Sequence, residues 1–194
     1  MKSVVLLGSV LLLSACGSMQ SQVVKKNVAF DPDSQAQIRS YGSYGSDLIR
    51  IYPETDCAKW EGTKRNTVNR RFVNGLPRKV RNISIGIPPT ELSRKTEKDT
   101  GFVFRDSYRE MVVSANQPVV LDGAFSSQTR NQHYSCRVAA SFTPKAGEAY
   151  EVRYLSEEEG CDIEVYHIGH EEKDGVRPTK KLTANYCAKP GTSF

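Results

Sequence analysis

Two histidines near the C-terminal end of the chain are the residues best suited to metal chemistry. His167 and His170 stand three positions apart in the segment His-Ile-Gly-His-Glu-Glu, residues 167–172. Imidazole and carboxylate groups are ligands that zinc accepts. On a β-strand, however, side chains three positions apart point to opposite faces of the sheet. Gly169 would allow the chain to bend, but the sequence identifies no third ligand. We therefore predict a solvated strand end, with no metal site and no cofactor.

Motifs for nucleophilic catalysis or phosphate binding are missing from the sequence. It contains no Gly-x-Ser-x-Gly and no Gly-x-x-x-x-Gly-Lys-Ser/Thr. A nucleophilic enzyme also needs a base and an orienting acid beside its serine, cysteine or threonine. The carboxylate run Glu157-Glu158-Glu159 is typical of a solvated turn. We predict no catalytic residues and a protein that is not an enzyme.

Four cysteines after residue 50 predict two disulfides. They are Cys57, Cys136, Cys161 and Cys187, and an even number is typical of disulfide-bonded exported proteins. The sequence contains no Cys-x-x-Cys pair, which would have pointed to a metal site instead. If a hairpin turn centres on Asp174, the last two cysteines each lie thirteen positions from it and face one another, with Cβ atoms about 4.5–5.5 Å apart. This predicts the pairs Cys161–Cys187 and Cys57–Cys136, although a β-bulge in the hairpin would change them.

The first sixteen residues indicate export and anchoring. Lys2 precedes a ten-residue apolar run, Val4–Leu13, and then Ser14-Ala15-Cys16. A membrane-spanning helix needs about 20 residues, so residues 1–15 are typical of a secretory signal peptide. Leu-Ser-Ala-Cys resembles the lipobox of bacterial lipoproteins. That resemblance implies that Cys16 becomes the lipidated mature N-terminus, with palmitate among its acyl chains. Gly17, in place of aspartate, implies the outer membrane and leaves open whether the periplasmic or the outer face carries the protein.

The rest of the chain divides into a short tether and one domain. Residues 16–27 are small, polar and without pattern, as in a flexible tether. Residues 28–194 make a segment whose length is typical of one domain, and we predict a single β domain there. Hydrophobic residues make up 38% and charged residues 25% of the sequence, which is ordinary for a globular domain and too polar for further membrane spans.

Apolar and polar residues alternate over many short stretches separated by turn residues, which predicts β-strands. The predicted strands cover residues 36–40, 48–52, 80–86, 108–113, 118–121, 136–142, 149–155, 161–168 and 180–187. Residues 90–100 are charged and predict a loop or a single helical turn. The fold class we predict is all-β or mainly β, an antiparallel sandwich or small barrel stapled by two disulfides.

Basic residues concentrate between Lys59 and Arg81, where Glu61 is the single acid. Such a stretch favours contact with anionic headgroups or an acidic partner, whereas solvated strand faces are the alternative. Export argues against nucleic acid as the partner. The residues predicted for this anionic-surface contact are Lys64, Arg65, Arg70, Arg71, Arg78 and Lys79.

These features together predict a non-catalytic outer-membrane lipoprotein that acts by binding proteins or other envelope components. Its membrane contact is made through the N-terminal acyl chains. The alternative is a small-ligand or metal-binding lipoprotein that uses the tyrosine loop at residues 41–46 or the His167/His170 end. An enzyme of unfamiliar type is the third hypothesis.

Overall fold

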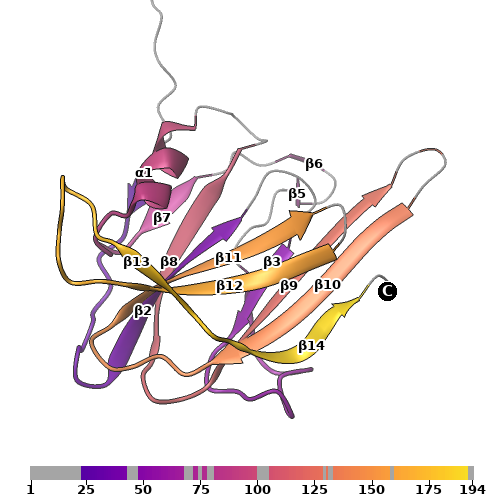
Figure 1. The fold of residues 1–194 in the computed structure, drawn as a ribbon, viewed down its shortest axis with the longest axis horizontal. Helices are drawn as coiled ribbons and strands as arrows, with labels where there is room; N and C mark the ends of the chain where they lie inside the picture. Colours follow the sequence, from indigo (N-terminus) through magenta and orange to yellow (C-terminus); the bar gives the residue numbers. More distant parts are fainter. Residues whose placement is uncertain are drawn as a thin grey trace, which may run out of the picture.

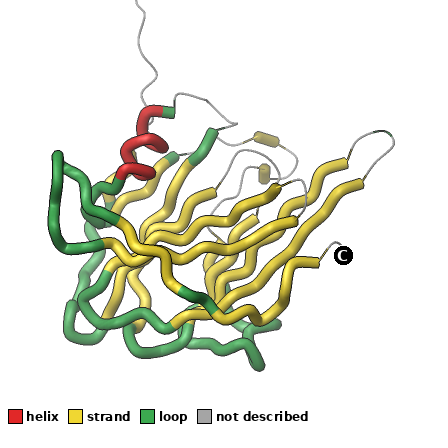
Figure 2. Tube along the Cα trace, viewed as in Figure 1, coloured by secondary structure: helices red, strands yellow, loops and turns green. Residues whose placement is uncertain are grey.

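The protein is a sandwich of two β-sheets with one short helix on its outside (Figures 1 and 2). The computed structural model describes residues 23–42, 48–67, 72–73, 76–77, 81–99, 105–128, 130, 133–157 and 160–191. The predicted fold class, a mainly β sandwich stapled by two disulfides, is confirmed. No helix in these ranges is long and apolar enough to cross a membrane.

The larger sheet has seven strands and mixed direction. Its order is β1 (Val23–Lys25), β7 (Asn82–Ser84), β8 (Ser107–Ser114), β2 (Gln35–Gly42), β11 (Ala149–Glu157), β12 (Gly160–Ile168) and β13 (Thr179–Leu182). The pairs β1–β7, β7–β8 and β2–β11 are parallel, and the remaining neighbours are antiparallel.

The second sheet has five strands, all antiparallel to their neighbours. Its order is β14 (Asn185–Gly191), β10 (His133–Phe142), β9 (Val119–Gln128), β3 (Leu48–Tyr52) and β4 (Asn66–Thr67). A separate two-stranded ribbon joins β5 (Phe72–Val73) and β6 (Leu76–Pro77).

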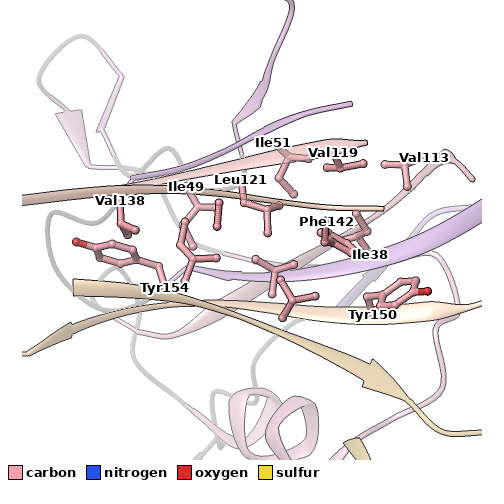
Figure 3. Packing of buried hydrophobic residues seen from close by; sticks show 14 of the residues in the cluster. Ile38, Ile49, Ile51, Val113, Val119, Leu121, Val138, Phe142, Tyr150 and Tyr154 are labelled. Atoms are coloured by element: carbon pink, nitrogen blue, oxygen red, sulfur yellow. The ribbon is translucent and has the colours of Figure 1, made fainter. Parts of the chain in front are cut away.

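The hydrophobic core fills the space between the two sheets, because alternate residues of the central strands point inward (Figure 3). Ile38, Leu121, Val138 and Val152 contribute from four different strands and are at most 1% exposed. Full burial of a side chain of this size contributes about 1.5–3 kcal/mol.

Both disulfides form, but their predicted partners were wrong. The bonds join Cys136 to Cys161 and Cys57 to Cys187. The first links β10 to β12 and therefore ties the two sheets together through the core. The second ties the turn after β3 to β14.

The prediction failed because the last hairpin does not continue as far as the cysteines. The ladder between β12 and β13 ends at the pair Val165–Leu182. The chain then leaves the seven-stranded sheet and enters the other one as β14, beside β10 (Figure 1). Cys187 consequently lies in a different sheet from Cys161, which is paired with Ser156 instead.

The segment predicted as a loop or one helical turn is a two-turn helix, α1 (Glu91–Lys98). Its start is fixed by Thr90, whose hydroxyl accepts from the Ser93 backbone N–H at 3.2 Å, while the Ser93 hydroxyl accepts from the Thr90 N–H at 2.9 Å. This reciprocal capping satisfies two backbone donors that a helix start otherwise leaves free.

The end of the predicted tether belongs to the sheet. Val23–Lys25 form β1, and the Lys26 N–H donates to the Ser84 carbonyl at 2.8 Å. The predicted signal peptide and residues 16–22 of the predicted tether, Cys16 among them, lie outside the described residues.

Candidate functional site

The outer face of the seven-stranded sheet carries a buried ionic cluster. Arg39 on β2 lies between Glu110 on β8 and Glu151 on β11, at directly paired positions. Its Nε and Nη2 donate to Glu110 Oε1 at 2.9 and 2.7 Å, and its Nη1 donates to Glu151 Oε1 at 3.2 Å. None of the three residues is more than 3% exposed. A buried charge is tolerated when it is paired and hydrogen-bonded in this way.

The second oxygen of Glu110 holds the segment that follows β7. Oε2 accepts from the backbone N–H groups of Ile85, Gly86 and Ile87 at 2.7, 3.1 and 3.2 Å. Arg39 Nη2 also donates to the Ile87 carbonyl at 2.7 Å. The cluster therefore binds the segment leading to α1 onto the sheet.

Glu151 fixes the start of α1 in the same manner. The Tyr41 hydroxyl donates to Glu151 Oε1 at 2.5 Å, and the Thr90 hydroxyl donates to the same oxygen. Burial, together with the nearby Glu151 carboxylate, raises the pKa of Tyr41 far above its ordinary value. Each nitrogen of the Arg39 guanidinium has an acceptor, so we assign this cluster a structural role rather than a reactive one.

Beside this cluster, an open groove of about 1320 Å³ lies between α1 and the loop that joins β12 to β13. Figure 1 shows α1 and the yellow loop on the same side of the molecule. The Arg94 guanidinium donates to the Gly175 carbonyl at 2.7 Å, and the Arg177 N–H donates to the Pro89 carbonyl at 2.8 Å. These two bonds connect the walls of the groove.

Charged side chains of both signs line the groove, with the basic ones in excess. The lining residues comprise four carboxylates, Glu91, Glu171, Glu172 and Asp174, and six cations, Arg94, Lys95, Lys98, Arg153, Lys173 and Arg177.

Arg153 is a groove cation that the fold holds in place through an ion pair and a ring contact. It lies on β11 two residues after Glu151, to whose Oε2 its Nη2 donates at 3.2 Å. Its guanidinium also lies 4.2 Å from the centre of the Tyr166 ring. The side chain is 24% exposed. A guanidinium fixed before binding loses less side-chain entropy when it pairs with a carboxylate or phosphate.

The two histidines of the sequence analysis come together, contrary to the opposite-face argument. β12 ends at Ile168, so His170 lies beyond the strand and the alternation rule does not apply to it. The ring centres of His167 and His170 are 6.1 Å apart, and both rings contact Glu148. No pattern in the sequence pointed to Glu148, which precedes β11 and is brought close to the histidines only by strand pairing.

The third histidine contacts a serine but builds no catalytic triad in the part of the chain that the structure describes. His133 Nε2 lies 3.3 Å from Ser126 Oγ across the β9–β10 hairpin. No carboxylate among the described residues bonds to the His133 ring, so the orienting acid of a triad is missing there.

Other predicted site residues fall only partly within the described structure. Lys64 and Arg65 are exposed beyond the turn that follows β3. Tyr41, from the proposed ligand loop, is buried in β2. The remaining predicted basic contacts, Arg70, Arg71, Arg78 and Lys79, lie outside the described residues, as does most of the tyrosine loop.

No protein-family model, no curated protein and no solved structure matches this chain. Its function is therefore inferred from the residues and the geometry described above.

Proposed function

We propose that this protein is a non-catalytic lipoprotein of the bacterial outer membrane, and that its β-sandwich binds a segment of another envelope protein. Binding takes place in the groove between α1 and the β12–β13 loop, where an acidic side chain of the partner pairs with Arg153. The observation that carries the proposal is the preoriented Arg153 guanidinium among the charged walls of this groove.

The proposed location in the outer membrane is based on the N-terminal sequence and is consistent with the disulfide bonding of the cysteines. The lipobox resemblance at Leu13-Ser14-Ala15-Cys16 supports lipidation of Cys16. Disulfides persist in oxidising compartments such as the periplasm, and the four remaining cysteines are all bonded. An anchored domain also meets partners in the same membrane at a raised local concentration.

The charge pattern favours a protein segment over a uniformly anionic polymer. The groove has six cations and four carboxylates, so a ligand of a single negative sign would meet repulsion from the four carboxylates. A segment with mixed charge can match both signs, and such complementarity selects partners. Arginine is suited to the anchoring position because its planar fork binds a carboxylate through two hydrogen bonds.

Site-specific photocrosslinking in the intact envelope tests this proposal. A photoreactive residue replaces Lys95, which is exposed on α1 beside the groove, and in a separate strain it replaces Gln117, which is exposed in the β8–β9 turn. We expect one discrete protein adduct from position 95 and none of the same mass from position 117. Equal adducts from both positions, or none from position 95, would contradict binding in the groove.

A further inference from the structure

We propose that Glu148, His167 and His170 form a zinc site with three protein ligands and an open fourth position. The three side chains each direct one ligand atom into a common space, and these atoms all lie within 4.8 Å of one another. None of the three ligands lines the groove, although His170 belongs to the same β12–β13 loop, and the zinc site does not depend on the proposed partner.

Strand pairing and a bend place the three ligands together. Tyr150 on β11 pairs with His167 on β12, so Glu148 and His167 lie near the same end of these two strands. Gly169 follows the strand, and its N–H donates to the Pro178 carbonyl at 2.8 Å. The chain then bends at His170, whose ring returns to the same carboxylate.

The distances suit a metal after small side-chain movements. His167 Nε2 lies 2.5 Å from Glu148 Oε2, and His170 Nε2 lies 3.1 Å from the same oxygen. In a tetrahedral zinc site with bonds of about 2.0–2.1 Å, neighbouring ligand atoms stand about 3.3–3.4 Å apart. A zinc ion would thus take the place of the hydrogen bonds between Glu148 and the two imidazoles, after small changes in the distances between the three ligand atoms.

The backbone around Glu148 is held firmly, so little ordering is needed when a metal binds. Its carbonyl accepts from the Gln37 N–H at 3.0 Å, and the N–H of Gly147 donates to the Gln35 carbonyl at 2.9 Å. Gly147 has φ +73°, a value that glycine adopts without strain. The Tyr150 ring also packs against His167 at 5.7 Å between ring centres, which limits rotation of the imidazole.

The ligand types favour a transition metal such as zinc. Two imidazoles and one carboxylate are the ligand set of open zinc sites, and also of non-haem iron(II) sites, whereas calcium and magnesium prefer oxygen ligands alone. Glu148 and His167 are about one quarter exposed and His170 is 68% exposed. Solvent therefore has access to the ion, and the fourth position is open to water or to a ligand group.

Isothermal titration of ZnCl₂ into the mature, tag-free protein in detergent tests the site. We expect one zinc ion per chain. His170→Ala and Glu148→Gln should each weaken binding at least about tenfold, because even residues that only support metal ligands typically contribute that much. His133→Ala is the matched control, because His133 lies on β10 and does not belong to the proposed site. This substitution should leave zinc binding unchanged.

His170→Ala keeps the test decisive because this side chain is mostly exposed and its removal leaves the core intact. A second readout is the melting temperature, which zinc should raise in the wild-type protein and in His133→Ala but not in His170→Ala. The proposal is overturned if no zinc binds at one ion per chain, or if binding is equally strong in His170→Ala and in wild type.

Discussion

Arg39 and Glu110 form a buried ion pair at paired positions of β2 and β8, with Arg39 Nη2 and Glu110 Oε1 2.7 Å apart. The same carboxylate receives three backbone N–H groups of the segment before α1 through its other oxygen. One side chain thereby neutralises a buried cation and fixes the segment that carries one wall of the groove.

Glu110→Ala should lower the free energy of unfolding by about 3–5 kcal/mol, because it leaves a buried guanidinium without its main partner. The control is Lys181→Ala, which breaks the ion pair of this exposed lysine with Glu164 and should cost at most about 1 kcal/mol. Urea unfolding measures both. Equal losses of unfolding free energy in the two variants would show that the buried ion pair contributes no more to stability than the exposed one.

Non-reducing peptide mapping of the purified protein should recover the pairs Cys136–Cys161 and Cys57–Cys187. Replacing either pair by alanines should cost about 2–5 kcal/mol, as for native disulfides of small exported domains. The inter-sheet bond lies in the core, so its loss also removes buried contacts. Recovery of Cys161 joined to Cys187 would contradict the crossing of the chain between the sheets.

Stability should fall above about pH 10, the ordinary pKa of tyrosine. The folded protein keeps the proton on Tyr41, because burial and the Glu151 carboxylate raise the pKa of this phenol. Burial and the hydrogen bond to Glu97 act in the same direction on the pKa of Tyr108. The unfolded chain releases these protons first, so the free energy of unfolding decreases as the pH rises, with a slope for Tyr41 that approaches about 1.4 kcal/mol per pH unit well above pH 10.

Tyr41→Phe removes one of the phenol groups that lose a proton on unfolding at high pH. Its unfolding free energy, measured by urea titration between pH 9 and 11, should therefore fall less over this range than that of the wild type, by about 1.4 kcal/mol in total. Parallel pH profiles for the two proteins would refute the buried, protonated state of this phenol.

Cys16→Ala should abolish lipid attachment. Cells grown with labelled palmitate should show label on the wild-type protein and none on this variant, because Cys16 is the residue that would carry the acyl chains. Cys57→Ala is the control and should retain the label. Continued labelling of Cys16→Ala would rule out the lipobox assignment.

Local patterns predicted the strands well, because alternation reflects burial on one face of a sheet. The prediction for residues 48–52 coincides with β3, and that for residues 149–155 lies within β11. The disulfide partners were not predictable, because the chain changes sheets after Leu182 without a turn signal that distinguishes this step from a hairpin.

The candidate sites depend on contacts between distant segments. Glu148 lies nineteen residues before His167 in sequence, and only the β11–β12 pairing joins them. The groove likewise combines α1 with a loop about 80 residues later, as in the contact between Arg94 and Gly175. Helix capping by Thr90 and Ser93 was visible in principle, but serine replaces the usual glutamate of that motif.

The most direct measurement of the central claim is the yield of the position-95 crosslink in intact envelopes when Arg153 is replaced by glutamine. The matched control is Arg50→Gln, since Arg50 is 25% exposed and ion-paired to Asp122 in the other sheet. We predict that Arg153→Gln reduces the yield about tenfold or more, as expected for loss of a charged anchor worth over about 1.4 kcal/mol, while Arg50→Gln leaves it unchanged. An undiminished yield in Arg153→Gln, or an equal loss in both variants, would contradict binding through this groove.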